Sequence, residues 1–227
     1  MEPIWNLIIY FSVCAFIGWI LQAIEDLFQR KKITNTGFLY GPFIPLFGFT
    51  ALIIYFFNLY FVNYSLQFRL IIFFILPTLM EYFTGFFLEK MFKVKLWDYS
   101  DYRFNINGRI SLLASIIWFI LVLIQVFILQ EIIFSEINQF NEISRIILAM
   151  GLIIYFAIDF FFSAKVFYYF AKIKKEFEKE GKMNLEKLNK KIHLRIRSIQ
   201  RKMKISPVFK KNIGKEIGDF IEKINKK

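Results

Sequence analysis

Four acidic residues lie within or at the ends of long apolar stretches of this sequence: Glu25, Glu81, Glu89 and Asp159. A carboxylate in an apolar medium is unfavourable unless a partner, a hydrated path or a proton-transfer role compensates for it. Glu25 and Glu89 lie near the ends of their stretches, where lipid headgroups or loop cations are within reach, whereas the other two lie deeper. We therefore expect Glu81 and Asp159 to line a substrate path or to lock helices together. The competing interpretation is a pure stability role through pairing with Arg109 or Lys165.

A second group of polar residues stands just before the fourth apolar stretch and consists of Asp98, Asn105, Asn107 and Arg109. The planar guanidinium of Arg109 suits a carboxylate or phosphate bound through two hydrogen bonds. Asn107 is followed by Gly108, and this dipeptide favours a tight turn that would position Arg109. The group predicts a polar cluster at the inner end of the fourth helix.

The segment between the first and second apolar stretches contains three glycines and two prolines among residues 35–48. Because proline lacks an N–H and glycine is a weak helix former, this composition is not that of an ordinary helix start. We predict a tightly turned, re-entrant segment, with Gly37, Tyr40, Gly41 and Pro42 as its structural residues.

Apolar helices must position these residues. Of the 227 residues 57% are hydrophobic, and the mean hydropathy is +0.47, which is more apolar surface than a soluble domain of this size can hide. Five apolar stretches are each long enough for a helix to cross a hydrocarbon core about 30 Å thick. They cover residues 4–27, 43–62, 66–88, 110–130 and 143–170. We predict an all-α polytopic transmembrane helix bundle of about five helices over residues 1–170, followed by a basic cytosolic helical tail over residues 171–227.

The net charge of +12 resides in the tail, because residues 172–227 hold 19 Lys or Arg against 7 Asp or Glu. Within the apolar part, basic residues concentrate in the segments that join the first helix to the second and the third to the fourth. The positive-inside rule then predicts that the N-terminus lies outside, and that both basic loops and the C-terminus lie in the cytoplasm.

The tail carries apolar residues at helical spacing, with basic residues between them, on either side of Ser206-Pro207. This pattern predicts two amphipathic basic helices. Their expected partners are the anionic lipids of the inner leaflet or a protein, whereas nucleic acid is disfavoured because few aromatic side chains are present to stack on bases. The single cysteine, Cys14, and the single histidine, His193, give no basis for a metal site, and we expect no cofactor.

Several short motifs occur over residues 10–125, about half of the chain: Phe16-Ile17-Gly18-Trp19 with Glu25, Gly37 to Pro42, Glu81-Tyr82 to Gly85, Leu88-Glu89, Trp97 to Ser100, and Asn105 to Ile110. In these motifs the sequence resembles the bacterial family labelled putative type IV ABC-transporter permease. The resemblance implies a multi-pass protein of the bacterial cytoplasmic membrane that works in transport with a separate ATPase subunit. The chain itself has no Gly-x-x-x-x-Gly-Lys-Ser/Thr motif for binding ATP.

Three functions are consistent with these features. The first is a transport component in which Glu81, Glu89, Asp159 and Arg109 line the substrate path, in a homo-oligomer because five helices enclose only a small pore. The second is a non-enzymatic scaffold or regulator whose basic tail binds lipid or a partner. The third is a lipid-modifying membrane enzyme that uses inner-side carboxylates and Arg109, by acid–base chemistry or with a carboxylate-bound divalent metal. We rank the transport component first and the scaffold second, so the expected class is non-enzymatic.

Overall fold

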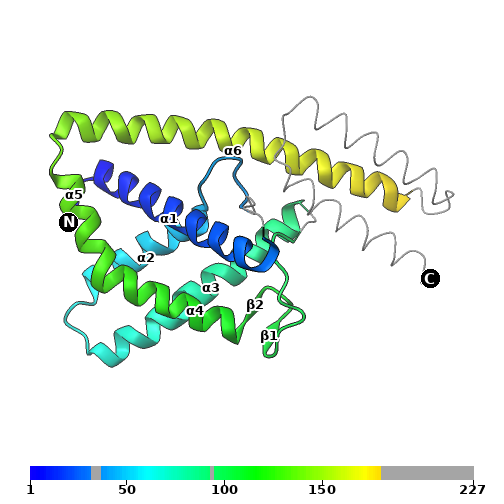
Figure 1. Cartoon of the computed structure of the whole chain (residues 1–227), viewed down its shortest axis with the longest axis horizontal. Coiled ribbons are helices and arrows are strands. Elements are labelled where there is room, and N and C mark those ends of the chain that lie inside the picture. Colours follow the sequence, from blue (N-terminus) through cyan, green and yellow to red (C-terminus); the bar gives the residue numbers. More distant parts are fainter. Residues whose placement is uncertain (32–36, 93–94, 180–227) are drawn as a thin grey trace.

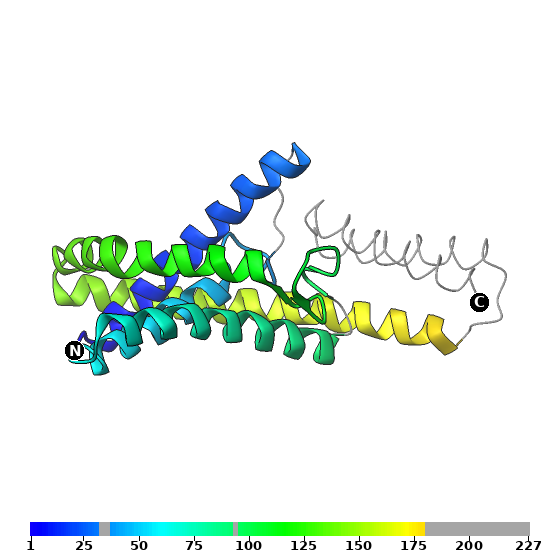
Figure 2. The ribbon, with the colours of Figure 1, turned by 90° about the horizontal axis from the view of Figure 1, so that it is seen from below.

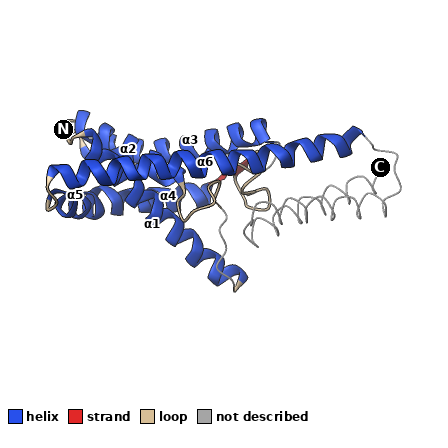
Figure 3. Cartoon of the chain, turned by 90° about the horizontal axis from the view of Figure 1, so that it is seen from above, coloured by secondary structure: helices blue, strands red, loops and turns tan. Residues whose placement is uncertain are grey.

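The structure, a computed structural model, describes residues 1–31, 37–92 and 95–179, and these residues are largely helical (Figures 1 and 3). The helices are α1 (Ile4–Arg30), α2 (Pro45–Tyr60), α3 (Leu66–Phe92), α4 (Leu112–Ile124), the π-helical turn η1 (Gln125–Leu129), α5 (Gln130–Asn138) and α6 (Glu142–Lys179). Two short strands, β1 (Asn105–Ile106) and β2 (Ile110–Ser111), form an antiparallel hairpin between α3 and α4. The two predicted tail helices, with His193, lie outside the described residues.

Within the described residues, four helical stretches are long and apolar enough to cross a membrane: Ile4–Phe28, Leu66–Phe92, Leu112–Asn138 and Glu142–Lys165. They correspond to the first, third, fourth and fifth predicted segments, and the predicted all-α bundle is confirmed. Many large apolar side chains on these helices are exposed, such as Ile147, Ile154 and Phe161 of α6. A bilayer is the solvent that suits such a surface.

The second predicted segment, residues 43–62, is helical only over α2, which corrects the expectation of a full-length helix there. The 16 residues of α2 span about 24 Å, short of a hydrocarbon core of about 30 Å. Pro45 fixes its start, because the missing N–H is harmless in the first turn of a helix. Ile44, which precedes that proline, is extended with φ −113° and ψ 99°.

The turns of the chain gather at two ends of the bundle (Figures 1 and 2). The N-terminus, the α2–α3 turn and the α5–α6 turn lie at one end. The β1–β2 hairpin and the C-terminal ends of α1 and α3 lie at the other, which we call the hairpin end. The C-terminal half of α1 diverges from the remaining helices towards this end (Figure 2).

Residues 37–44 lie within the bundle, between the middle of α1 and the middle of α6. The Ile44 N–H donates a hydrogen bond to the Ala15 carbonyl at 3.0 Å, and the Gly41 N–H donates to the Asp159 carboxylate at 2.9 Å. This non-helical segment leads directly into α2, as the predicted re-entrant turn requires.

Two glycines allow α1 and α2 to pack closely. A Cβ on Gly18 of α1 would overlap the side chain of Phe47 in α2. A Cβ on Gly48 of α2 would lie 2.6 Å from the ring of Phe11 in α1 and 2.8 Å from its carbonyl oxygen. Each helix therefore places a phenylalanine against the glycine of the other, which is the small-residue packing typical of membrane helices.

The fourth membrane crossing is made of α4, η1 and α5 in succession. Gln125, the first residue of η1, is buried and donates hydrogen bonds to the Tyr10 hydroxyl at 2.8 Å and to the Ala51 carbonyl at 3.2 Å. Its amide thus links this crossing to α1 and α2, and its polar groups are satisfied inside the bundle rather than left in lipid.

Candidate functional site: a cavity with an acidic end

A cavity of about 1340 Å³ lies among α1, α2, α3, α4 and α6 and extends to the segment that precedes the hairpin. Small-molecule pockets occupy about 300–1,000 Å³, so this space is large enough for a ligand. Its walls are mainly apolar. The charged residues among the described lining residues are Glu25, Asp26, Glu81 and Asp98, and none of that lining is Lys or Arg. These acids come from the parts of the chain nearest the hairpin end.

Glu81 of α3 lines this cavity and is 3% exposed. Its Oε1 accepts a hydrogen bond of 2.9 Å from the Tyr99 hydroxyl, and Trp118 of α4 adds a weaker polar contact to the carboxyl group. Its Oε2 is buried and has no hydrogen-bond partner within residues 1–31, 37–92 and 95–179. Since buried acceptors are normally satisfied, Glu81, which lines the cavity, keeps an unused acceptor that is itself buried.

Tyr99 joins the carboxyl groups of two helices at this end of the cavity. Burial, together with the charges of Glu81 and Glu25, raises the pKa of Tyr99 above its usual value. The phenol therefore stays protonated and donates to Glu81. Glu25 of α1 is close enough to act on Tyr99 and also accepts a hydrogen bond of 3.0 Å from Gln22.

The turn predicted from Asn107-Gly108 is present. Both residues have left-handed backbone angles, with φ 55° and 68°, and the Arg109 N–H donates to the Ile106 carbonyl at 3.0 Å. Gly108 is also required for space, because a Cβ there would overlap the Asp98 carboxylate. The Tyr99 N–H donates to the Gly108 carbonyl at 2.8 Å, which fixes the segment that carries Tyr99 against the hairpin.

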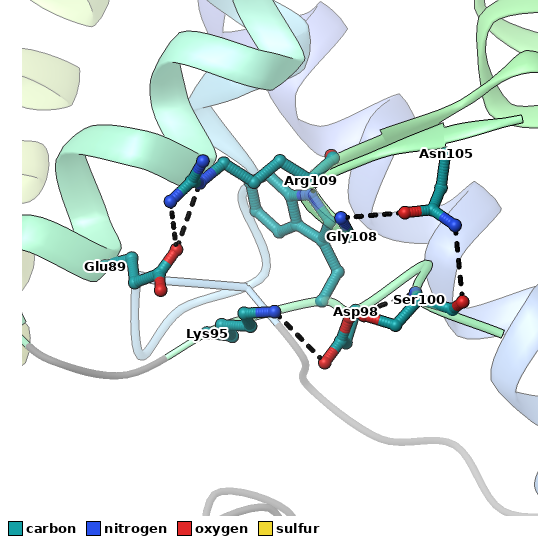
Figure 4. A network of polar contacts seen from close by, with 8 residues as sticks. Glu89, Lys95, Asp98, Ser100, Asn105, Gly108 and Arg109 are labelled. Atoms are coloured by element: carbon teal, nitrogen blue, oxygen red, sulfur yellow. Dashed lines mark hydrogen bonds and ion pairs between the residues drawn. The ribbon is translucent and has the colours of Figure 1, made fainter.

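Asp98 and Asn105 hold this turn together (Figure 4). Asp98 Oδ1 accepts hydrogen bonds from the Ser100 N–H and hydroxyl at 3.1 and 2.5 Å, and Oδ2 pairs with Lys95 at 3.3 Å. Burial opposes the charge, but these contacts outweigh it and hold the pKa of Asp98 below its usual value. The contacts therefore persist at neutral pH and weaken only as the pH falls through that lowered pKa. Asn105 donates to the Ser100 carbonyl at 3.3 Å and accepts from the Gly108 N–H at 3.1 Å.

Arg109 attaches the hairpin to α3 (Figure 4). Its Nε and Nη2 donate to Glu89 Oε2 at 3.0 and 2.9 Å, and its guanidinium lies 5.6 Å and 5.3 Å from the ring centroids of Tyr82 and Phe86. Asn107 makes a long hydrogen bond of 3.4 Å to the Tyr82 hydroxyl. The expectation that Arg109 binds a carboxylate in this cluster is met by Glu89.

Gly85, one turn after Glu81 on α3, lets the same segment approach the helix. A Cβ on Gly85 would lie 3.3 Å from the Trp97 indole, and the Trp97 Nε1 donates to the Arg109 carbonyl at 2.9 Å. The contact of Trp97 with Gly85 and the hydrogen bond from Tyr99 to Glu81 thus place residues 97–99 across the hairpin end of the cavity.

We expect Arg109→Ala to release the hairpin from α3, because the variant loses both hydrogen bonds to Glu89 and the aromatic contacts. The variant should also unfold more readily than the wild type. Hydrogen–deuterium exchange of residues 95–111 in detergent is the measurement, and faster exchange there is the expected result. Arg103→Ala, at an exposed position of the same segment, is the matched control. Equal exchange in the two variants would show that the Glu89–Arg109 pair does not hold the hairpin.

Asp159 of α6 holds the re-entrant segment, in an arrangement we call the Asp159 latch. Its Oδ1 and Oδ2 accept hydrogen bonds from the Tyr40 and Gly41 N–H groups, each at 2.9 Å. Ser163 donates to Oδ1 at 3.2 Å and accepts from the Tyr40 N–H at 3.0 Å. Backbone groups that a helix would satisfy internally are here satisfied by α6. The Phe43 N–H donates to the Gly41 carbonyl at 2.9 Å across Pro42, which completes the turn.

The structure separates the predicted site residues into three places. Glu25 and Glu81 lie at the cavity together with Asp98, and Gly37 also lines it. The hairpin and its attachment to α3 involve Asp98, Asn105, Asn107, Arg109 and Glu89. The latch and its turn consist of Asp159, Tyr40, Gly41 and Pro42. The Asp159 carboxylate accepts hydrogen bonds from backbone N–H groups there, and not from Arg109 or Lys165.

Sequence reasoning missed Tyr99 as a partner of Glu81 and Ser163 as a partner of Asp159. The spacing of four between Asp159 and Ser163 on one helix face is the signal that could have identified the second pair.

No group of three or more His, Cys, Asp or Glu side chains in the described ranges 1–31, 37–92 and 95–179 is arranged to hold a metal ion. The carboxylates near the cavity instead interact with Tyr99, Gln22 and Lys95.

Membrane-length helices and a re-entrant half-length helix define a multi-pass membrane protein with a bundle fold, and a half-open cavity lies among its helices. The family model described as Putative ABC-transporter type IV matches residues 9–164, and the chain belongs to this family. The match confirms the resemblance seen in the motifs and extends it beyond residue 125 into α6, including Asp159. No curated protein and no solved structure matches the chain.

Proposed function

We propose that this chain is the membrane-spanning component of an ABC-type transport system and that its cavity holds the substrate during transport. Membership of the family and four membrane-length helices support a membrane transport component. The observation that carries the proposal is the cavity of about 1340 Å³ with Glu81 buried in its wall. A half-open cavity of this size that reaches a buried carboxyl group among the helices favours a binding role.

The orientation that we propose places the hairpin end in the cytoplasm and the N-terminus outside. Lys90, Lys95 and Arg103 lie at the hairpin end, whereas Glu136 and Glu142 lie near the α5–α6 turn at the other end. The positive-inside rule favours this orientation in the bacterial cytoplasmic membrane. The hairpin and the basic tail, residues 171–227, are then the cytosolic elements available to dock a separate ATPase subunit, and the tail can also contact anionic lipid.

We expect an ATPase subunit to co-purify when the full chain is gently extracted from its own membrane, and native mass spectrometry is the measurement. The mass of the complex also gives the number of copies of this chain and tests the proposed homo-oligomer. A matched chain that ends at residue 179 distinguishes the two docking elements, since the ATPase is retained if the hairpin docks it and lost if the tail does.

Recovery of other proteins without any ATPase would contradict the transport proposal. If those proteins were lost from the chain that ends at residue 179, the result would support the alternative of a scaffold with a partner-binding tail. Turnover of lipid by the purified chain alone would instead support the membrane enzyme.

A further inference from the structure

We propose, resting on the transport function above, that the cavity binds an amphipathic organic cation. The apolar body of this ligand lies against the cavity walls, and its positively charged head lies at Glu81. Three observations carry the assignment: the sign of the lining charges, the unused acceptor of Glu81, and the aromatic side chains around it.

The charge of the cavity selects a cation. Its described lining includes four acids and no Lys or Arg; one of the acids, Asp98, pairs with Lys95, and Glu81 has a buried oxygen without a partner in the described residues. Apolar walls of low dielectric strengthen the field of such charges inside a cleft and attract ligands of the opposite sign. An anionic ligand would meet no positive side chain among the described residues that line this space.

Glu81 supplies the contact for the positively charged head. Tyr99 occupies Oε1 from one side, which orients the carboxyl group, and Oε2 stays buried without a hydrogen-bond partner among the described residues. A positively charged head beside the Glu81 carboxylate would be held by electrostatic attraction in apolar surroundings, and a head that carries an N–H would in addition donate a charge-assisted hydrogen bond to Oε2. The same contact would satisfy the acceptor that the protein leaves without a partner within residues 1–31, 37–92 and 95–179.

Aromatic side chains beside Glu81 suit an organic cation better than a metal ion. Trp118 contacts the Glu81 carboxyl and packs against Phe47 with ring centroids 4.5 Å apart, and both line the cavity with Tyr99. Aromatic faces next to a carboxylate are a recurrent arrangement for ammonium groups. A divalent metal ion needs several oxygen ligands, and the described residues contain no group of three or more acidic, His or Cys side chains suited to one.

Binding of tetraphenylphosphonium to the purified full-length protein in lipid nanodiscs tests the inference. Tetraphenylborate, an anion of nearly the same size and shape, is the matched probe. We expect the cation to bind at least about 10-fold more tightly than the anion, and Glu81→Gln to weaken cation binding by about 10-fold or more. Glu136→Gln removes the same charge from an exposed position on α5 and is expected to leave binding unchanged.

A second measurement keeps the test valid if Glu81→Gln does not fold. Dicyclohexylcarbodiimide modifies carboxyl groups in apolar surroundings, and peptide mass spectrometry locates the modified residue. On the wild-type chain we expect modification at Glu81, with protection by tetraphenylphosphonium and none by tetraphenylborate. Equal binding of both probes, or full affinity of a folded Glu81→Gln variant, would overturn the inference.

The outcome separates this inference from the transport proposal, because neither measurement needs an ATPase. Cation binding at Glu81 without an ATPase partner would retain the site and reject the transporter. If an ATPase co-purified but the protein bound the cation no more tightly than the anion, the transport proposal would be retained and the cation site rejected. The same binding measurement in nanodiscs with and without phosphatidylethanolamine identifies the source of the cationic head. If this lipid weakens the binding of tetraphenylphosphonium, the natural ligand is a lipid headgroup. If it leaves that binding unchanged, the natural ligand is a free solute.

Discussion

Asp159→Ala is expected to destabilise the bundle by about 1–3 kcal/mol. The substitution removes the acceptors of the Tyr40 and Gly41 N–H groups, which lie inside the bundle at 2.9 Å from the carboxylate. The Gly41 N–H loses this buried acceptor at a cost of about 1–3 kcal/mol, whereas the Tyr40 N–H keeps the Ser163 hydroxyl as an acceptor. Denaturation in detergent, followed by tryptophan fluorescence, measures the loss.

Two neighbouring variants make this prediction specific to the latch. Asp159→Asn keeps one carbonyl oxygen as an acceptor, so its loss of stability should fall between those of the wild type and Asp159→Ala. Ser163→Ala removes only the additional contact with the Tyr40 N–H and should have the smallest effect. Wild-type stability of Asp159→Ala would mean that the re-entrant segment does not depend on α6.

Gly48→Ala is expected to destabilise the contact between α1 and α2 by about 2–3 kcal/mol, in the upper part of the range for overpacked cores. The added methyl group would lie 2.6 Å from the Phe11 ring and 2.8 Å from the Phe11 carbonyl oxygen. A ring can rotate away, but a backbone oxygen moves only if α1 moves. The same denaturation assay measures the effect.

Gly151→Ala is the matched control for this substitution. It adds the same methyl group to a membrane helix, α6, at a position where nothing lies within 4 Å. Alanine is a better helix former than glycine, so this variant should be neutral or more stable by up to about 1 kcal/mol. If the two alanine variants behaved alike, close packing at Gly48 would not determine the α1–α2 contact.

The parts of the fold that follow from local pattern could be predicted from the sequence. Membrane-length apolar runs give α1, α3, the fourth crossing and α6, because a helix is the structure that satisfies its own backbone in lipid. The Asn107-Gly108 dipeptide gives the hairpin turn, since both residues tolerate a left-handed backbone. The prolines before residue 46 indicate an irregular start to α2, although they do not predict that this helix is short.

The parts that depend on contacts between distant segments could not be predicted. The Tyr40–Asp159 hydrogen bond joins residues 119 positions apart, and no spacing rule links a loop to the middle of a helix that far away. Glu81 and Asp159 are equivalent in sequence, as single acids in apolar runs. Only the packed bundle distinguishes an acid with an unused oxygen from one whose two oxygens both accept backbone hydrogen bonds.

The Asp159 latch also affects how the protein is made. Gly41 leaves the ribosome 118 residues before Asp159, and at about 5–20 residues per second the interval is on the order of 10 s. During that time the Tyr40 and Gly41 N–H groups lack the Asp159 carboxylate that accepts their hydrogen bonds in the complete structure. The first half of the protein therefore cannot complete its folding in the membrane until the last crossing, α6, has been synthesised and inserted.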